Sequence, residues 1–440
     1  MGRTRLITAA AFTGSLGWGA ILPFQYAYVV DARHWGAAAG MLTGTLFCVG
    51  AVVAAPLAGR LADRYSAGRL AVVVSLIAAM ATLAMGLAGS VTTFLAGMLV
   101  LGAAVTAAAP ATQVLVLESV PAADRRSVFA YQFTSQALGM AVGAFAAGLV
   151  VEVDTPTGMW PAFAAATLGF VVTAAFLAAA TRTAADLTAA TRWGQEVSTG
   201  STAGSGSTAE LDGDGWRTYR FLARNRQVRL LGLLSIALAA GFYAQFETGL
   251  PAFALQSLSV EPTVVGTAAA VNCVVIVGLQ WLVVRLTGSQ SGAALLAVVG
   301  GIWVASWLLL EVALFVSPQV AGVMFVVTFA IFAVGETMYA PILSPLTAAV
   351  APAGLVGTTL GALAALRTGI SAVGPLVAGV LFAFDLPHVF VLGHVAINAA
   401  AIALAVRLHQ AQTAPTSDVD TVAQGAPDRS GGTDAEPVPA

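Results

Sequence analysis

The chain has 440 residues, of which 58% are hydrophobic and 9% charged, and its formal net charge is -2. A mean hydropathy of +0.87 excludes an ordinary soluble protein and indicates a polytopic membrane protein. Both cysteines, Cys48 and Cys273, lie inside apolar runs. They therefore offer neither a disulfide framework nor a metal site.

Twelve apolar runs are long enough to cross about 30 Å of hydrocarbon at about 1.5 Å per residue. They cover residues 6–30, 37–58, 70–90, 93–118, 127–151, 160–181, 229–256, 263–286, 292–315, 320–343, 357–384 and 388–408. The first run lacks a convincing cleavage site, so we interpret it as a spanning helix rather than a signal peptide. The sequence predicts an all-α integral membrane protein with twelve transmembrane helices.

The runs divide the chain into two halves. We expect an N-terminal six-helix bundle over 1–181, a cytoplasmic linker over 182–228, a C-terminal six-helix bundle over 229–408 and a disordered cytoplasmic tail over 409–440. The linker contains a Gly/Ser/Thr-rich run, and the tail has no apolar periodicity, so neither has much surface to bury.

Arginines collect on one side of the predicted bundle. They are Arg3, Arg5, Arg60, Arg64, Arg69, Arg125, Arg126 and Arg285. The other side carries Arg33 and is otherwise acidic or neutral. The positive-inside bias predicts that the Arg-rich side and both termini are cytoplasmic, in a multi-pass protein of the cell membrane.

The two halves also share backbone-determining residues. A shift of 231 residues places Pro110 on Pro341, Pro121 on Pro352, Gly143 on Gly374 and Gly148 on Gly379. Proline restricts the backbone and glycine allows helices to approach closely, so both occur at particular positions. Four coincidences at one offset therefore indicate a repeat. A parallel repeat of this kind places a substrate site at the interface of the halves, near mid-membrane.

The segment 59–69 reads GRLADRYSAGR and ends the second predicted helix. Its Gly-x-Leu-Ala-Asp-Arg pattern resembles the loop between helices 2 and 3 of major facilitator superfamily (MFS) transporters. The resemblance implies that Asp63 faces the cytoplasmic end of helix 11 and latches the halves together in the outward-facing state. We therefore assign a conformational-switch role, without substrate contact, to Gly59, Asp63, Arg64 and Arg69, with Glu118 and Arg125 in the inner gate network.

A second resemblance, to the drug-efflux branches of this family, rests on small residues in helices 5 and 11. These are Gly139, Gly143, Gly148, Gly374, Pro375 and Gly379. Such residues allow helices to approach closely. Met98 stands where the efflux branches carry an Arg in helix 4.

Four ionisable residues stand out inside predicted spanning helices. Glu311 lies near the outer end of its helix, where we expect it to snorkel to the interface, and the other three are Glu247, Glu336 and Arg367. A charge at mid-helix costs about 2.5 to 3.5 kcal/mol, so we expect them to face a partner or a wet cavity. Desolvation favours the neutral carboxyl, so Glu336 can bind a proton near neutral pH. Arg367 cannot deprotonate and needs an acceptor, with Glu336 the first candidate and Glu247 the second. Interfacial snorkelling of Glu247 and a static contact for the other two are the alternatives.

Smaller polar groups are candidates to line the substrate path. They are Trp18, Gln25, Tyr26, Gln132, Gln136, Tyr243, Gln245 and Asn272. Any one of them is more often a plain contact between helices.

The MFS resemblance and the buried carboxylates favour a secondary transporter that works by alternating access and exports a small amphipathic or drug-like compound in exchange for protons. Uptake or facilitated diffusion of a metabolite and a non-transporting membrane sensor are the alternatives. The sequence has no GxxxxGK[ST] phosphate loop and no grouped nucleophile and base, so we expect neither ATP-driven transport nor an enzyme. The expected partners are the lipid bilayer, a small-molecule substrate and the proton gradient. We expect a monomer without cofactor, metal or nucleic acid.

Overall fold

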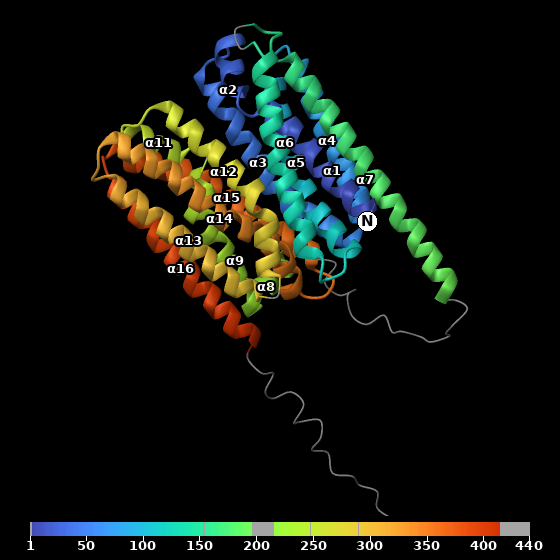
Figure 1. Ribbon diagram of the computed structural model, residues 1–440. Helices are drawn as coiled ribbons and strands as arrows, with labels where there is room; N and C mark the ends of the chain where they lie inside the picture. Colours follow the sequence, from blue (N-terminus) through green and yellow to red (C-terminus); the bar gives the residue numbers. More distant parts are fainter. Residues whose placement is uncertain (1, 153–154, 196–214, 247, 289, 414–440) are drawn as a thin grey trace, which may run out of the picture.

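The computed structural model describes residues 2–152, 155–195, 215–246, 248–288 and 290–413. Every regular element within these ranges is helical (Figure 1). Eleven of the described helices are long and apolar enough to cross a membrane, and α1 (Gly2–Ile21) with residues 25–32 forms a bent pair that gives a twelfth span. The predicted all-helical membrane fold is confirmed.

The N-terminal half contains seven further elements after α1. They are α2 (Gln25–Ala27), the π-helix η1 (Tyr28–Ala32), α3 (Ala37–Arg64), α4 (Ala67–Gly86), α5 (Val91–Ser119), α6 (Arg125–Val150) and α7 (Trp160–Gln195). Helix α1 packs against α6 and α7, and α5 packs against α3 and α4. Ser66 and Ser90 begin α4 and α5 by accepting the backbone N–H of Arg69 and Thr93, as N-cap residues do.

The C-terminal half repeats this plan with a broken seventh span. Its elements are α8 (Gly215–Arg224), α9 (Arg226–Leu238), the π-helix η3 (Ala239–Tyr243), α10 (Ala244–Phe246), α11 (Gly249–Gln256), α12 (Pro262–Thr287), α13 (Gly292–Ala313), α14 (Pro318–Val350), α15 (Val356–Ala383) and α16 (Pro387–Thr413). Helix α13 packs against α14 and α16, and α12 packs against α14. Pro262 and Pro318 occupy the first positions of α12 and α14, where a missing backbone N–H does no harm.

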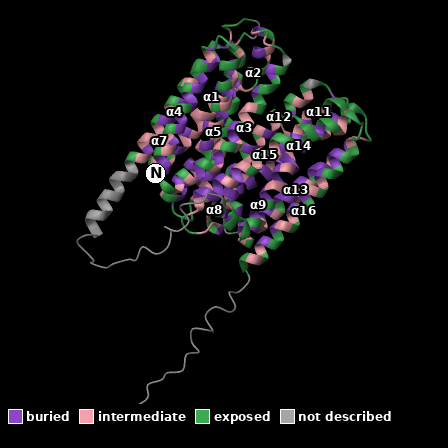
Figure 2. Cartoon of the chain, turned by 180° about the vertical axis from the view of Figure 1, so that it is seen from behind, coloured by how far each residue is buried: buried purple, intermediate pink, exposed green. Residues whose placement is uncertain are grey.

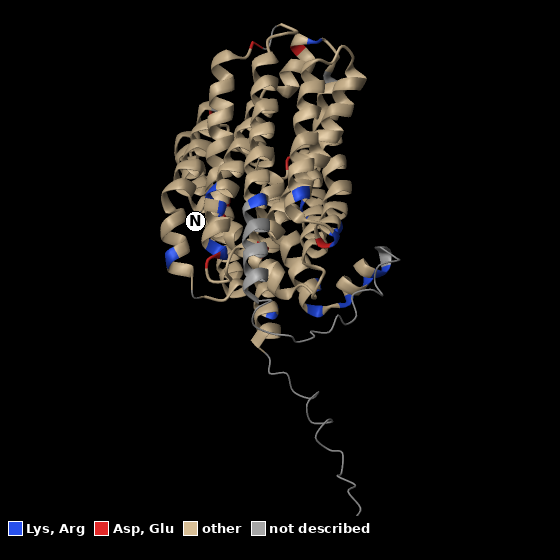
Figure 3. Cartoon of the chain, turned by 90° about the vertical axis from the view of Figure 1, so that its right-hand side faces the viewer, with Lys and Arg blue, Asp and Glu red and all other residues tan. Residues whose placement is uncertain are grey.

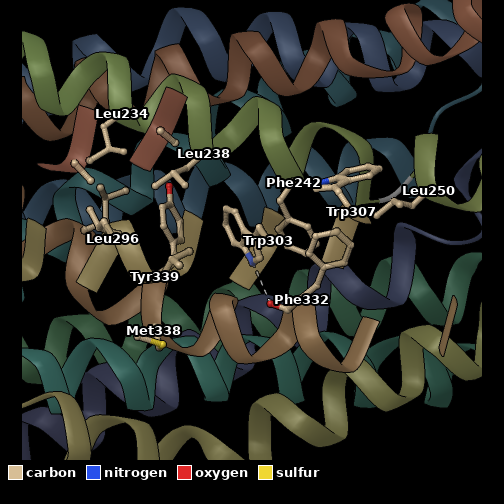
Figure 4. Packing of buried hydrophobic residues seen from close by; sticks show 14 of the residues in the cluster. Leu234, Leu238, Phe242, Leu250, Leu296, Trp303, Trp307, Phe332, Met338 and Tyr339 are labelled. Carbon is tan, nitrogen blue, oxygen red and sulfur yellow. Dashed lines mark hydrogen bonds between the residues drawn. The ribbon is translucent and has the colours of Figure 1, made fainter. Parts of the chain in front are cut away.

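Each half has its own core. Figure 2 shows buried residues along the inner faces of the helices and exposed ones on the outer faces. Aromatic side chains dominate the core of the C-terminal half, where Phe242, Trp303, Trp307 and Phe332 are fully buried (Figure 4). Many large apolar side chains on the outside, such as Leu168 and Val274, are exposed, as expected of a surface that faces lipid.

The two halves lie side by side and meet mainly through α3 and α15, with further contacts of α6 to α12 and α14 (Figure 1). Figure 3 shows that most basic residues lie toward the end of the molecule that holds the N-terminus. We call this the Arg-rich end. The chain enters α4 and α15 and leaves α3 and α12 at this end.

Helices extend further at the Arg-rich end than the sequence predicts. The segment 59–64, predicted as part of a loop, is the last part of α3, and only Tyr65 and Ser66 separate it from α4. Helix α7 runs to Gln195 and α8 lies within the predicted linker, while α16 continues to Thr413. Residues 196–214 of the linker and 414–440 of the tail lie outside the described residues.

Candidate functional site

A cavity of about 1550 Å³ lies between the two halves. It is lined by α1, α3, α5 and α6 on one side and by η3, α14 and α15 on the other. This volume exceeds the roughly 300 to 1,000 Å³ of a usual small-molecule pocket. Most of the lining is apolar, and it includes Trp18 stacked on Phe47 with ring centroids 4.6 Å apart.

Five of the eight polar residues predicted for the cavity line it: Trp18, Tyr26, Gln132, Gln136 and Tyr243. Gln25, Gln245 and Asn272 are not among the lining residues. Gln245 is buried and donates to the backbone oxygen of Gly374 at 3.2 Å, and Asn272 is buried and donates to that of Phe329 at 3.4 Å.

Several lining groups were missed by the sequence reasoning. They are Ser15, Thr112, Gln113, Ser344, Thr368 and Ser371. These are short polar side chains within uniformly apolar helices, and nothing in their sequence context distinguishes a cavity face from a helix contact. The repeat offers one signal, because its offset of 231 residues places Gln113 on Ser344.

Glu336 lies in α14 behind the wall of the cavity. It is 7% exposed and does not line the cavity, whereas Tyr243 and Tyr339 beside it do. The side chains of Asn272 and Tyr243 lie within hydrogen-bonding reach of its carboxyl group. Its Oε2 atom is buried without a hydrogen-bond partner among the described residues. An orphaned buried carboxyl oxygen is expensive when ionised.

An aromatic cluster backs this carboxyl group. The rings of Tyr243 and Tyr339 are 5.4 Å apart, and Trp303 lies against both. The indole N–H of Trp303 donates to the backbone oxygen of Phe332 at 3.2 Å, one turn before Glu336 (Figure 4). Trp303 and Tyr339 are part of the apolar core of the C-terminal half, so the Glu336 side chain lies beside that core.

Arg367 of α15 lines the cavity and donates to the hydroxyl of Tyr339 at 3.5 Å. The predicted ion pair between Arg367 and Glu336 is not present between these two described residues. Each of them contacts a tyrosine instead, because Glu336 lies behind the cavity wall and Arg367 lies within it. Glu247, the second predicted partner, lies outside the described residues.

The π-helix η3 places Tyr243 against Glu336. It exposes the backbone oxygen of Gly241, which accepts from the indole of Trp307 at 2.7 Å and from the amide of Asn398 at 3.1 Å. Gly241 is required here because a Cβ atom would lie 2.6 Å from the Asn398 side chain. Single π-turns of this kind are frequent at functional sites.

The halves touch at the Arg-rich end through Asp63. Its carboxylate accepts the backbone N–H groups of Gly357 and Thr358 and the hydroxyl of Thr358, each at 2.6 Å. These groups form the N-terminus of α15, where an anion is stabilised by unpaired N–H groups and by the helix dipole. Gly59 and Gly357 allow the close approach, since a Cβ atom on either would collide with the backbone of the other helix.

A second contact of opposite charge crosses the same end. The guanidinium of Arg126, at the start of α6, donates to the backbone oxygens of Thr287 at 2.6 Å, Gly288 at 3.3 Å and Gln290 at 2.6 Å. These oxygens follow the last turn of α12, where a cation is favoured. Its neighbour Arg125 donates to Leu117 and Val120 at the end of α5, inside its own half. Arg126 is therefore the one that reaches the other half, and the inner-gate role of Arg125 stays a prediction.

The remaining predicted switch residues, Arg64, Arg69 and Glu118, lie at the same end of the molecule. Arg69 and Glu118 are exposed, and Glu118 lies close to Arg3 and Asp63. Arg64 is exposed at the end of α3.

Helix α8 also contacts both halves at the Arg-rich end. The Tyr219 hydroxyl donates to the backbone oxygen of Pro56 in α3 at 3.1 Å, and the Arg60 guanidinium lies 4.9 Å from the Tyr219 ring centroid. Leu222, one turn later, is buried in the core of the C-terminal half. Burial raises the pKa of the Tyr219 hydroxyl, although Arg60 opposes this, so the hydroxyl remains a donor at neutral pH.

The predicted packing residues divide into two groups. Gly139 and Gly143 lie against the backbone of α1, and Gly374 lies against that of Ala244. Gly148 meets only the ring of Phe24, and Gly379 has open space, so close packing does not explain these two. Pro375 lines the cavity.

The family profile described as Major Facilitator Superfamily matches residues 7–375. The structure is similar to the crystal structure of the human organic anion transporter MFSD10 (TETRAN), with a TM-score of 0.63 and 17% sequence identity over 92% of this chain and 99% of that one. A likeness at this identity establishes the fold alone. The comparison with curated protein sequences gave no match. Because the family profile spans most of the sequence, this chain belongs to the Major Facilitator Superfamily of membrane transporters.

Proposed function

We propose that this transporter couples the movement of a small amphipathic compound to the proton gradient by alternating access, with Glu336 as the group that carries the proton. The single observation behind this proposal is the position of Glu336, buried beside the cavity wall with an unpaired oxygen. A carboxyl group that is not held by a fixed cation can gain and lose a proton as the cavity changes its exposure.

The closed Arg-rich end supports the alternating-access part of the proposal. Asp63 and Arg126 join the halves there, while the cavity is lined by α3 residues 41–53, which precede this contact along the helix. The lining includes Tyr26 and Met41, which are exposed. With the Arg-rich end in the cytoplasm, as the positive-inside bias predicts, this arrangement corresponds to an outward-open cavity.

Export is the direction that the partial efflux motifs favour. In that case the proton and the compound compete for the cavity and move in opposite directions. The experiment is transport in sealed vesicles of the purified protein, with a panel of anionic, cationic and neutral amphipathic compounds and with or without an imposed proton gradient. Accumulation of a panel member against its gradient, opposite to the proton, supports export.

Co-transport of the compound with a proton is the second candidate, and Arg367 favours it. A guanidinium in the cavity favours an anionic compound, and an anion bound near Glu336 stabilises the neutral acid through like-charge repulsion with the carboxylate. Proton and anion then bind together and move in the same direction. The same vesicles decide between the two candidates by the direction of movement relative to the proton.

The Glu336→Gln variant tests the coupling residue. We expect loss of gradient-driven accumulation with retained exchange of labelled compound, because exchange needs no net change in protonation. Glu311→Gln is the matched control, since Glu311 pairs with His388 at 2.6 Å and does not line the cavity. Undiminished gradient-driven accumulation in the Glu336→Gln variant removes Glu336 from the mechanism.

A further inference from the structure

We infer that the cavity binds amphipathic organic anions, and that Arg367 holds their anionic group. This inference rests on the proposed transport function, because it names the class of compound that the cavity of that transporter takes. It is carried by the charge of the cavity, the free donors of Arg367, and the arrangement of polar and aromatic groups around it.

The first step is the charge of the cavity. Among the described residues that line it, Arg367 is the only Asp, Glu, Lys, Arg or His. A guanidinium cannot lose its proton in a protein, so this part of the wall carries a fixed positive charge. A cationic compound is repelled by it, and a neutral compound leaves it unpaired in a largely apolar space.

Most N–H donors of the Arg367 guanidinium are available to a ligand. Its contact with the Tyr339 hydroxyl, at 3.5 Å, lies at the long limit of a hydrogen bond. Within the described part of the chain it has no carboxylate partner, and Glu336 lies behind Tyr243 and Tyr339. A guanidinium has five N–H donors in a planar fork that fits the two oxygens of a carboxylate or sulfonate.

The third step is the set of donors around Arg367. Thr368 and Ser371 follow it on α15 and also line the cavity. Across the cavity, Gln136 of α6 lines the opposite wall at the position that the repeat pairs with Arg367, and Gln132 lies one turn earlier. An anionic group at Arg367 can therefore receive hydrogen bonds from both halves, which is the geometry that alternating access requires of a substrate.

The fourth step is the apolar remainder of the cavity. The Trp18 and Phe47 rings form a stacked pair in the wall of the N-terminal half. Aromatic surface of this kind holds the ring system of a ligand whose polar end lies elsewhere. The fitting compound is thus an aromatic or aliphatic body with one carboxylate or sulfonate.

Three matched probes test this inference: naphthalenesulfonate, naphthalenesulfonamide and naphthyltrimethylammonium. They share the ring system and differ in charge. Binding of each to the purified full-length protein in detergent is measured by calorimetry. We expect the sulfonate to bind about tenfold or more tightly than the other two, the scale of a charge-assisted hydrogen bond. Equal or weaker binding of the sulfonate overturns the inference, whatever the variants do.

Substitutions then locate the site. Arg367→Gln should weaken sulfonate binding by about 10-fold to 100-fold and leave sulfonamide binding within a few fold, whereas Arg367→Lys, which keeps the charge, should restore part of the affinity. Arg33→Gln is the control, because Arg33 lies over the Trp35 ring at 4.3 Å and does not line the cavity. Unchanged sulfonate affinity in the Arg367→Gln variant overturns the assignment.

The same probes separate this inference from the proton coupling. Sulfonate binding without any proton-dependent flux in the wild-type protein removes the proposed coupling and leaves the anion site standing. Proton-driven transport of the cationic probe with no binding of the sulfonate removes the anion site and leaves the coupling standing.

Discussion

Asp63 illustrates how one side chain joins two halves of a transporter. Its carboxylate receives two backbone N–H groups and one hydroxyl from the start of α15, so it acts as the N-cap of a helix in the other half. Opening the Arg-rich end must break all three hydrogen bonds at once. A single carboxylate therefore biases the conformational equilibrium of the whole molecule.

The Asp63→Asn variant should shift that equilibrium toward an open Arg-rich end. The amide keeps the shape but loses the charge, a change of about 1 kcal/mol that raises the open fraction about fivefold. Spin labels at the exposed positions Ala123 and Ala353, with both native cysteines replaced, report the distance across this end. Asp31→Asn, at an exposed acid outside this contact, is the control. An unchanged distance distribution in the Asp63→Asn variant contradicts the latch.

The neighbouring arginines at the start of α6 donate hydrogen bonds to the C-terminal ends of two different helices. Arg126 reaches the end of α12 in the other half, whereas Arg125 reaches the end of α5 in its own half. Both place a cation on exposed carbonyl oxygens at a helix C-terminus. Only the first of these contacts must break when the halves separate.

Glutamine substitution of each arginine should therefore have a different effect. Arg126→Gln should shift the equilibrium toward the open state by only about 1 kcal/mol, because the charged hydrogen bonds of Arg126 are partly screened by solvent. Arg125→Gln should lower the thermal stability by a similar amount and leave the open fraction unchanged. The same spin-label pair and a melting curve measure both effects. Equal shifts in the open fraction for the two variants contradict the assignment.

Helix α8 should hold its place through Tyr219. Tyr219→Phe removes the hydrogen bond to Pro56 and should destabilise the docked helix by about 1 kcal/mol. Because burial raises the pKa of the Tyr219 hydroxyl, this contribution is present below about pH 10 and is lost as the pH rises further. Hydrogen exchange over residues 217–224 measures the effect, with Tyr65→Phe at an exposed tyrosine as the control. Unchanged exchange means that Tyr219 does not hold the helix.

At the scale of the whole molecule, the spanning helices could be predicted from the sequence. Which side chains face the cavity, the lipid or another helix could not be predicted. Apolar length determines where a helix crosses the bilayer. The observed spans differ from the predicted ones at the Arg-rich end and in the breaks of the first and seventh spans. Periodicity is weak where one face meets lipid and the other meets apolar helices, so Gln245 and Asn272 looked like cavity residues and are buried.

Two further features depend on tertiary contacts that no local pattern carries. The π-turn at Gly241 needs Trp307 and Asn398 to donate hydrogen bonds to its exposed carbonyl oxygen, and both lie in distant helices. The position of Glu336 behind Tyr243 follows from that turn. In the same way, a rotation of one residue decides that Arg126 rather than Arg125 crosses to the other half.

Proton movement driven by the substrate itself tests the central claim most directly. Naphthalenesulfonate is added outside proteoliposomes that contain a pH-sensitive dye and have no imposed gradient. We predict a change in internal pH that follows the flux of labelled sulfonate and disappears in the Glu336→Gln variant. The sign of the change distinguishes co-transport from exchange. Entry of labelled sulfonate at a constant internal pH would contradict it.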